Sequence, residues 1–543
     1  MSYLLVFFLA MIMSVALIPL MIRLAPRLGM VDYPDARKVH SAPIPRAGGV
    51  GIAIGTLIPV LIWTPPDPAL RGYLAASLIL LGFGVWDDAR TLGAPVKFLG
   101  QFIAAAVVVY YGHVYVLSLP FMNLHRLPLY LSQPFTMFAL VGMINALNVS
   151  DGLDGLAGGL SILSLGAIAY LALRASGYAA VAIALATLGG VLGFMRYNTH
   201  PARVFMGDAG SQFLGFTLGF LSVFLLQRVN PVLSPALPLL ILGLPIADLL
   251  AVIVQRLYLG LSPFVATKHH VHHRLLARGF DHYEAVVIIY AIQTAFIVLA
   301  LLMRYDADSA IVAVYLGICG LLFLFLFMMT RLGLKVHASR TSSRLSAVIG
   351  AVRNHPLFHA TPVFVITLFI PLLFLAVGLF AWDVPRDFGV GASVLAALLL
   401  LHLVFSGTND SIVLRAISYI TAAFVIYLES KYLAGRAPLL SAGETGYFIV
   451  LAVAIGLAVR YGTTVEFRTT PMDYLVILIV LSVGLLTGDN THRAYIGAMA
   501  IKLVIVFYGC EFISSRMKSR WNLLNLASLA TLAILGARGL GLG

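Results

Sequence analysis

Long apolar stretches recur along most of this chain and constrain its fold more than any other feature. The first covers residues 3–22, and ten more follow by residue 330. A membrane-spanning helix needs about 20 apolar residues, and within a bilayer only helices and closed barrels satisfy every backbone polar group. The stretches are continuous rather than alternating, which excludes a transmembrane β-barrel. The sequence therefore predicts an all-α fold, a polytopic integral membrane helical bundle.

The composition excludes several other classes of protein. Apolar residues make up 61% of the 543 positions and charged residues only 10%, whereas soluble domains carry about 25% charged residues. A soluble globular enzyme, a disulfide scaffold and a disordered chain are all excluded. Both cysteines, Cys319 and Cys510, lie inside apolar stretches and support neither a disulfide framework nor a thiolate metal site. The first apolar run has no basic n-region or cleavage site, so we interpret it as a span rather than a removed signal.

The apolar stretches fall into two blocks, which we interpret as two domains. Residues 1–330 contain about eleven expected spans, and residues 361–543 contain about seven more. A basic linker at residues 331–360 separates them and is expected in the cytoplasm, together with the basic loops at 23–47 and 256–283. This orientation places the N-terminus outside.

The second block offers no comparable motif, and structural or regulatory helices are the expected content. Its scattered charges are interpreted as loop or snorkelling side chains, namely Glu429, Lys431, Glu444 and Glu466.

Acidic residues are few in the first block and gather on one predicted face. The first 210 residues contain eight aspartates and no glutamate, and all except Asp67 fall at the predicted cytoplasmic face. Helix capping explains one or two of them, and short carboxylates also serve as metal ligands. Asp87 and Asp88 are adjacent and need a compensating positive charge, for which Lys97, Arg90 and a divalent cation are the alternatives.

A second acidic motif runs from Asn145 to Leu156. Asn145, Asn148, Asp151 and Asp154 follow one another at intervals of three residues. This spacing places them near one face of a helix, although the glycines between them indicate a break. Hard cations such as Mg²⁺ bind oxygen side chains of this type. The alternative is a polar loop with two Asp-Gly turns.

Two further motifs point to phosphate or metal. Asp208 lies between glycines just before a span, where small neighbours allow a ligand to approach the backbone; an N-cap is the alternative. Residues 268–274 hold four histidines between a lysine and an arginine. Such a cluster binds either Zn²⁺ or phosphate, and we favour phosphate because no cysteine accompanies it. The basic segment at 37–49 ends in a Gly-Gly helix start and suits a phosphate at the membrane surface.

Taken in order, these motifs resemble the polyprenyl-phosphate N-acetylhexosamine-1-phosphate transferases over residues 1–330. The five segments that carry the resemblance are RKVHSAPIPRAGG, DDARTLGAPVKFLGQ, NALNVSDGLDGLAGG, VFMGDAGSQFLGF and HHVHHR. The resemblance implies an Mg²⁺-dependent enzyme, with Mn²⁺ as a substitute. The enzyme would transfer an N-acetylhexosamine-1-phosphate from a UDP-sugar to undecaprenyl phosphate, release UMP and initiate a lipid-linked cell-surface glycan.

The resemblance also implies roles for individual residues. The catalytic residues would be Asp87, Asp88 and Asp208. The metal ligands would be Asn148, Asp151 and Asp208. The nucleotide-sugar would be bound by Asn145, Asp154, Asn198, His270, His272, His273 and Arg274. The lipid phosphate would be bound by Lys38, Arg46 and Lys97.

The donor sugar and the partners are less constrained. The peptidoglycan-precursor enzymes of this family are expected to carry three contiguous histidines in this motif, whereas Val271 interrupts the histidines here. The resemblance therefore favours UDP-GlcNAc over UDP-MurNAc-pentapeptide as the donor. A rarer UDP-sugar is a further alternative. A polytopic transporter is the alternative from another class, but transporters place ionisable groups near the bilayer midplane. Membrane lipids are expected partners and nucleic acid is not. A homodimer, and downstream glycan enzymes bound through residues 361–543, are open expectations. The expected location is the bacterial inner membrane, with a cytoplasmic active site.

Overall fold

The computed structural model describes most of the chain, and its described part is almost entirely helical. The described residues are 2–34, 42–121, 127–262, 270–333, 356–381, 384–405, 412–433, 438–461, 490–516, 519 and 521–541. Within them, ten helices are long and apolar enough to cross a membrane. The only sheet among them pairs two short antiparallel strands. The prediction of an all-α, polytopic membrane protein is confirmed.

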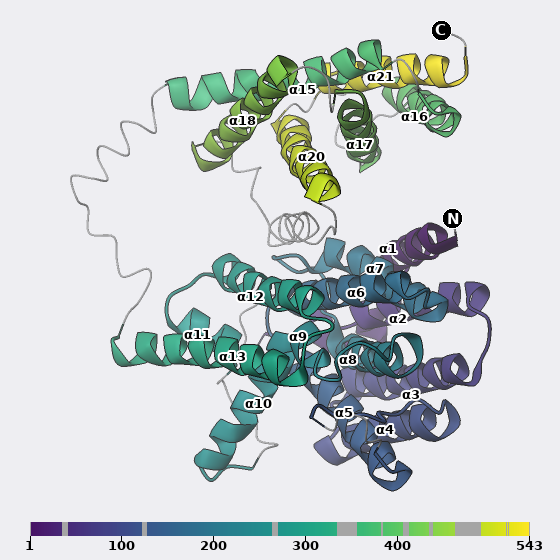
Figure 1. Cartoon of the computed structure of the whole chain (residues 1–543), viewed down its shortest axis with the longest axis vertical. Coiled ribbons are helices and arrows are strands. Elements are labelled where there is room, and N and C mark those ends of the chain that lie inside the picture. Colours follow the sequence, from purple (N-terminus) through teal and green to yellow (C-terminus); the bar gives the residue numbers. More distant parts are fainter. Residues whose placement is uncertain are drawn as a thin grey trace. The chain divides into compact units, whose positions relative to one another are not determined.

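The described residues divide into two compact units, one before residue 339 and one after it (Figure 1). The helices and strands of the first unit are α1 (Ser2–Leu28), β1 (Val31–Asp32), β2 (Ile44–Pro45), α2 (Gly48–Trp63), α3 (Pro68–Arg90), α4 (Ala94–Ala106), the π-helical η1 (Val107–Tyr111), α5 (Leu129–Ser150), α6 (Leu156–Arg174), α7 (Tyr178–Asn198), α8 (Gly207–Phe224), η2 (Leu225–Val229), α9 (Pro238–Ile241), α10 (Gly243–Tyr258), α11 (Val271–Ala277), α12 (His282–Leu302) and α13 (Asp308–Arg331). The apolar run at residues 235–255 does not form one continuous helix and is divided between α9 and α10.

Helix α8 forms the core of the first unit. The residues of its most apolar window are all buried, and α8 packs against α2, α3 and α5. The contact between α2 and α8 depends on glycine, because a Cβ added to Gly49 would lie 2.1 Å from the backbone nitrogen of Gly210. The Gly-Gly helix start noted in the sequence is therefore a site of close helix packing.

The segment before α2 is tied by its backbone to the segment that enters α8. Phe205 donates its N–H to the carbonyl of Pro45 at 2.8 Å, and Gly49 donates to the carbonyl of Met206 at 2.8 Å. These bonds place Arg46 beside the N-terminus of α8. Arg46 also forms an ion pair with Asp32, which is buried.

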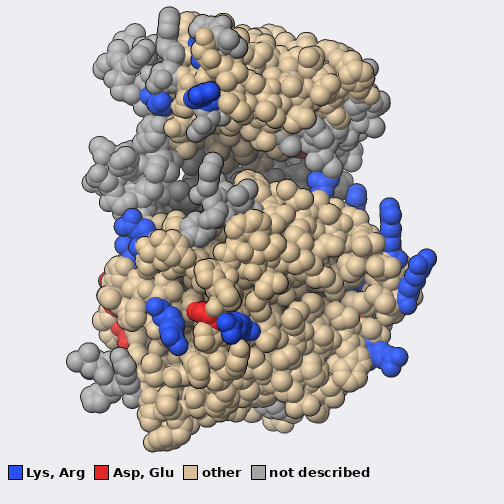
Figure 2. Space-filling model, turned by 90° about the vertical axis from the view of Figure 1, so that its right-hand side faces the viewer, with Lys and Arg blue, Asp and Glu red and all other residues tan. Residues whose placement is uncertain are grey.

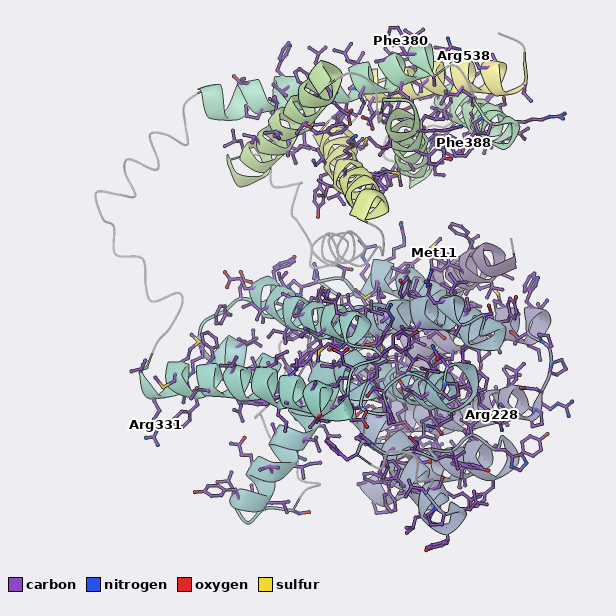
Figure 3. The ribbon with its side chains drawn as sticks, viewed as in Figure 1. Met11, Arg228, Arg331, Phe380, Phe388 and Arg538 are labelled. Carbon is purple, nitrogen blue, oxygen red and sulfur yellow. The ribbon has the colours of Figure 1, made fainter. Side chains whose placement is uncertain are left out.

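The described helices of the second unit are α15 (Pro356–Phe380), α16 (Arg386–Phe405), α17 (Ile412–Leu433), α18 (Pro438–Tyr461), α20 (Asn490–Arg516) and α21 (Leu523–Gly539). Arg538 of α21 donates to the carbonyls of Gly378, Leu379 and Ala381 at the end of α15, where Phe380 also lies (Figure 3). A cation is favourable there because carbonyls at a helix C-terminus have no partners within the helix.

The snorkelling interpretation is wrong for two charges of the second unit. Glu429 is 2% exposed and accepts hydrogen bonds from Lys502 at 2.9 and 3.0 Å. Lys502 also forms an ion pair with Glu444. Burial of a charge in an apolar bundle is tolerated when the charge is paired, which is why these side chains pair inside the unit. Glu466 lies outside the described residues.

The described surface is mostly uncharged. On the face shown in Figure 2, acidic and basic side chains are sparse between wide neutral areas. Large apolar side chains such as Phe138, Leu321 and Phe364 are more than half exposed on their helices. Such a surface suits contact with lipid tails rather than water.

Candidate active site

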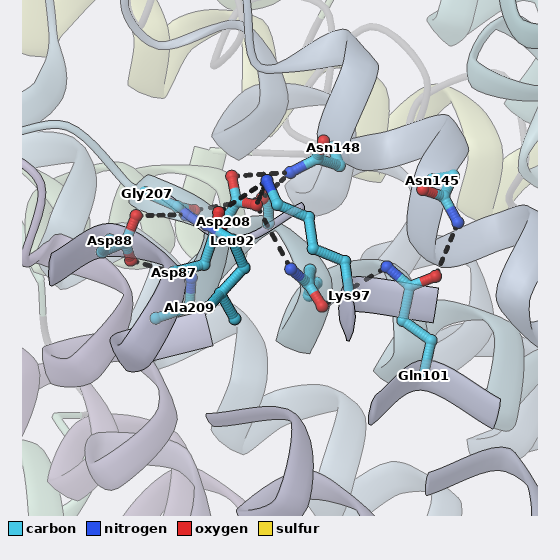
Figure 4. Close-up of polar contacts among 12 residues, drawn as sticks. Asp87, Asp88, Leu92, Lys97, Gln101, Asn145, Asn148, Gly207, Asp208 and Ala209 are labelled. Carbon is cyan, nitrogen blue, oxygen red and sulfur yellow. Dashed lines mark hydrogen bonds and ion pairs between the residues drawn. The ribbon is translucent and has the colours of Figure 1, made fainter. Parts of the chain in front are cut away.

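A lysine joins two of the predicted catalytic aspartates (Figure 4). Asp87 lies in the last turn of α3, and Asp208 lies in the first turn of α8. The Nζ atom of Lys97, on α4, is 2.6 Å from Asp87 Oδ2 and 2.8 Å from Asp208 Oδ2. Asp87 also accepts a hydrogen bond from the backbone N–H of Leu92. Lys97 therefore supplies the positive compensation that the sequence left open among three alternatives.

Asp88 faces in a different direction and binds the start of α8. Its carboxylate accepts hydrogen bonds from the backbone N–H groups of Asp208 at 2.8 Å and Ala209 at 3.0 Å. The first N–H groups of a helix have no intrahelical acceptor and attract an anion. Gly207 has a φ of +71°, and a Cβ there would lie 2.6 Å from the Asp88 carboxylate, so this contact requires glycine. The N-cap alternative for Asp208 is wrong, because Asp208 lies inside the helix and Asp88 serves its N–H.

Side-chain amides surround the inner side of Asp208. Asn148 Nδ2 donates to Asp208 Oδ1 at 3.1 Å and to Ser211 Oγ at 2.8 Å. Gln212 Nε2 donates to Asp208 Oδ2 at 3.3 Å. A chain of amides continues outward, since Gln101 Nε2 lies 3.4 Å from Gln212 Oε1 and Asn145 Nδ2 lies 2.8 Å from Gln101 Oε1. Asn145 is thus linked to the site through side chains that fix its position.

Asp151 has the least compensated charge of this group. It follows the last residue of α5, and its N–H bonds the carbonyl of Asn148 at 3.2 Å. Among the described residues, its carboxylate has no hydrogen-bond or ion-pair partner. Burial and the nearby charges of Asp208 and Asp154 raise the pKa of Asp151 to about 7. A cation at this position would relieve that repulsion.

The oxygen-bearing side chains of this region are of the type that binds a divalent cation. Asn148 uses its amide nitrogen in both of its side-chain bonds, and its oxygen, which has no partner among the described residues, is available as a metal ligand. Carboxylate and amide oxygens are the ligands that Mg²⁺ prefers. Asp87, Asp151 and Asp208 contribute three carboxylates to this group, and Lys97 contributes one ammonium group. Such an excess of negative charge favours a dication.

The predicted histidine motif meets the acidic loop through His272. A Cβ added to Gly152 would lie 2.2 Å from His272 Nε2, so the imidazole lies directly against that loop. Its ring is 4.2 Å from the ring of His273 and 5.8 Å from that of His270. Burial, together with the neighbouring His273, lowers the pKa of His272 to about 3. His272 is therefore neutral at physiological pH.

His270 and Arg274 are held by residues of α10. Asp248 accepts hydrogen bonds from His270 Nδ1 and from the backbone N–H of Val271, both at 2.9 Å. Arg274 donates to Gln255. Sequence reasoning missed Asp248, although an isolated aspartate inside an apolar stretch signals a functional or positioning role.

Asp154 and Asn198 lie in a neighbouring network rather than in the Lys97 cluster. Asn198 is 3% exposed, and its amide accepts from Gly155 N–H at 2.8 Å and donates to the carbonyl of Val204 at 2.9 Å. These bonds hold the loops before α6 and α8. Asp154 pairs with His200, whose role was not predicted.

The basic residues of the predicted lipid-phosphate site are partly described. Lys97 lies in the cluster, and Arg46 is close enough to Asp88 for an electrostatic interaction. Lys38 lies outside the described residues. Gln101 and Gln212 were not predicted, although each follows a predicted residue, Lys97 or Asp208, by four positions on a helix. That spacing places both residues of each pair on one face.

Comparison with known proteins identifies the family of this chain. Residues 70–226 match the model of glycosyl transferase family 4. The chain is 37% identical over 304 residues to a probable undecaprenyl-phosphate N-acetylglucosaminyl 1-phosphate transferase of Bacillus subtilis, an alignment that covers 55% of this chain and 84% of that protein.

Two further relatives carry related names. A decaprenyl-phosphate N-acetylglucosaminephosphotransferase of Mycobacterium tuberculosis is 36% identical, with 49% of this chain and 74% of that protein covered. An undecaprenyl-phosphate alpha-N-acetylglucosaminyl 1-phosphate transferase of Escherichia coli is 31% identical, with 49% and 74% covered. The chain therefore belongs to the family of polyprenyl-phosphate N-acetylglucosaminyl-1-phosphate transferases and is a multi-pass membrane enzyme.

Proposed function

We propose that this enzyme transfers N-acetylglucosamine-1-phosphate from UDP-GlcNAc to undecaprenyl phosphate and releases UMP. The observation that carries the proposal is the bridge from Lys97 to Asp87 and Asp208. It brings an ammonium group and two carboxylates together where the end of α3 meets the starts of α4 and α8. The relatives named above act on polyprenyl phosphates and N-acetylglucosamine.

The reaction joins two phosphates, so charge and position matter most. An oxygen of the lipid phosphate attacks the phosphorus that carries the sugar, and the bond from that phosphorus to the bridging oxygen breaks. UMP leaves with the bridging oxygen. Phosphoryl transfer of this kind depends on positioning and electrostatic stabilisation rather than on covalent help from the protein. Lys97 and Arg46 would bind the lipid phosphate, and Lys38 is proposed to assist them.

Asp87 would accept a proton from the lipid phosphate or orient it, because its carboxylate lies next to Lys97. Asp88 would hold the N-terminus of α8, and with it Asp208, in position. Direct attack needs no covalent aspartyl intermediate.

Asn148, Asp151 and Asp208 would hold Mg²⁺, for which Mn²⁺ is a substitute. The bound dication would neutralise the diphosphate of the donor and the charge on the departing UMP. The carboxylate of Asp151, for which the described part of the chain offers no hydrogen-bond or ion-pair partner, supports this placement.

The nucleotide-sugar would lie between the acidic loop and the histidine motif. Asp154 and Asn145 would contact the nucleotide, and His270, His272, His273 and Arg274 would contact the diphosphate or the sugar. A neutral His272 can donate one hydrogen bond to a phosphate oxygen without a charge. Asn198 would act through the loops that it holds.

The site is proposed to face the cytoplasm at the bacterial inner membrane, where the donor is available. A homodimer, and downstream glycan enzymes bound through residues 361–543, are further proposals that a size measurement and co-purification would test.

The test is UMP release by purified full-length protein in detergent with undecaprenyl phosphate and Mg²⁺. UDP-GlcNAc, UDP-GalNAc and UDP-MurNAc-pentapeptide are supplied separately, and release is expected with UDP-GlcNAc only. EDTA should stop it, and added Mg²⁺ should restore it. The matched variants are Asp208→Asn, expected to be inactive, and Asp306→Asn, an exposed loop carboxylate expected to retain activity. Release from all three donors alike, or full activity of Asp208→Asn, would refute the proposal.

A further inference from the structure

A second group of side chains of the type that binds metals lies apart from the Lys97 cluster. Asp154, His200 and His282 provide one carboxylate and two imidazoles, whose ligand atoms lie within 4.8 Å of one another. They come from three segments: the loop before α6, the loop before α8 and the first residue of α12. We propose that this triad binds a transition-metal dication of the Zn²⁺ class, at a site separate from the proposed Mg²⁺ site.

The three side chains already face one another. His200 Nδ1 is 2.6 Å from Asp154 Oδ2, and the rings of His200 and His282 stack with centroids 4.1 Å apart and planes 23° apart. His282 Nε2 is 3.3 Å from the backbone carbonyl oxygen of Asp154. Two ligands on a tetrahedral Zn²⁺ stand about 3.3 Å apart, so small rotations of these side chains suffice to enclose an ion.

Contacts outside the triad hold each member in place. The backbone N–H of Ala202 donates to Asp154 Oδ2 at 3.1 Å. Tyr283 Oη donates to the carbonyl of His200 at 3.2 Å, and its ring meets the His200 ring edge-on. The turn that begins with His282 is fixed by a capping box formed by Asp281 and Glu284. Supporting bonds of this kind orient metal ligands and strengthen binding.

The triad is also accessible. The side chain of His200 is 32% exposed and that of Asp154 is 17% exposed, so an ion can reach both without unfolding of the loops. This exposure distinguishes the triad from an Asp–His pair that is fully buried in a protein core.

The chemistry of the triad differs from that of the acidic cluster. Two imidazole nitrogens and one carboxylate suit Zn²⁺, Co²⁺ and similar ions, whereas Mg²⁺ prefers oxygen ligands. The alternative is an Asp–His hydrogen-bonded pair beside a stacked imidazole, with no ion. The two alternatives can be distinguished by experiment. A metal site requires the imidazole rings, whereas a hydrogen-bonded pair requires only an N–H donor at the same position.

Occupancy would have a functional consequence that rests on the proposed function. If Asp154 contacts the donor nucleotide, an ion on its carboxylate competes with the UDP-sugar. Zn²⁺ would then inhibit UMP release at saturating Mg²⁺ and raise the KM for the donor without a change in the KM for the lipid.

The direct test is Co²⁺ binding by the full-length protein in detergent, purified without a polyhistidine tag and kept in excess Mg²⁺. Visible absorbance of bound Co²⁺ and its loss on addition of Zn²⁺ report the site. His200→Asn and His282→Gln keep an N–H donor near the original nitrogen but remove the imidazole. Each is expected to weaken Co²⁺ binding about 10-fold or more.

Two control variants separate this site from the chain's other histidines. His113→Asn removes an exposed imidazole from a position with a φ of +52°, a conformation that asparagine tolerates. His273→Asn tests the histidine motif. Both should bind Co²⁺ as the wild type does.

Absence of Co²⁺ binding in the wild type, unchanged binding in both triad variants, or loss of binding in His273→Asn but not in the triad variants would overturn the proposal. Binding is measured without turnover, so failure of UMP release would refute the proposed function and leave this result standing.

Discussion

Replacement of Asp88 by asparagine should destabilise the first unit as well as impair the reaction. The Asp88 carboxylate accepts the backbone N–H groups of Asp208 and Ala209 with separate oxygens. Asparagine keeps one oxygen and turns an NH₂ group toward the other N–H, so two donors would face each other. The helix terminus also loses an anion.

The expected cost follows from these two losses. A carboxylate at a partly buried helix N-terminus stabilises by up to about 2 kcal/mol, and a buried N–H left without an acceptor costs about 1–3 kcal/mol. The terms overlap, so we expect a loss of about 2–4 kcal/mol in the free energy of unfolding. Loss of these bonds should also shift Asp208, and we expect kcat to fall by up to about 100-fold, the loss that a misplacement of about 1 Å can cause.

The assay is thermal unfolding in detergent, measured alongside UMP release. Asp67→Asn is the matched control, because Asp67 caps the other end of α3 through a bond from Leu70 N–H at 2.6 Å, and asparagine caps helices as well as aspartate does. Asp88→Asn should unfold several degrees below Asp67→Asn. An inactive Asp88→Asn that unfolds at the control's temperature would refute the structural role and make Asp88 a purely chemical group.

Two further predictions concern the same site, and a third concerns the packing of α2 against α8. Lys97→Gln should lower kcat/KM for UMP release about 10²–10³-fold, since the substitution removes one electrostatic stabiliser. Lys97→Arg should recover part of that loss. Equal activity of Lys97→Gln and the wild type would contradict a catalytic role for the bridge from Lys97 to Asp87 and Asp208. Because the pKa of Asp151 is raised to about 7 and a metal needs the ionised form, the Mg²⁺ concentration for half-maximal rate should rise as pH falls below 7, and Asp151→Asn should remove this dependence in an Mg²⁺ titration at several pH values. Gly49→Ala should destabilise the fold by more than about 3 kcal/mol in thermal unfolding, because its Cβ would lie 2.1 Å from Gly210 N on a buried helix; wild-type stability would show that α2 and α8 can separate.

The sequence predicted the helical class and the acidic motifs because both depend on local patterns. Apolar runs of membrane length have one structural solution, and the spacing of Asn148 and Asp151 is readable from the chain. Lys97 was named as a compensating charge because it is ten positions from Asp87 at the start of the next predicted span. The domain boundaries and the roles of the site residues stay predictions.

Other features of the structure could not be predicted from the sequence because they depend on contacts between segments that are far apart in the chain. Asp248 bonds His270, 22 residues later, and His282 meets the loop of Asp154, 128 residues earlier. In the second unit, the sequence predicted a loop or snorkelling charge at Glu429, because its partner Lys502 lies 73 residues later in the chain. An isolated polar residue in an apolar run shows that a partner exists, but it does not say which one.

The roles of the adjacent aspartates of α3, Asp87 and Asp88, depend both on their local spacing and on contacts with distant segments. Consecutive residues on a helix point about 100° apart, so the side chains of Asp87 and Asp88 need not share one environment. Asp87 is compensated by the ammonium group of Lys97, and Asp88 by the N-terminal amides of α8. A carboxylate held by two backbone amides is fixed in place, whereas one beside a partly exposed lysine can exchange partners with an incoming phosphate. Of the two, we therefore infer that Asp87 meets the lipid phosphate, and that Asp88 keeps Asp208 where the metal and the donor require it.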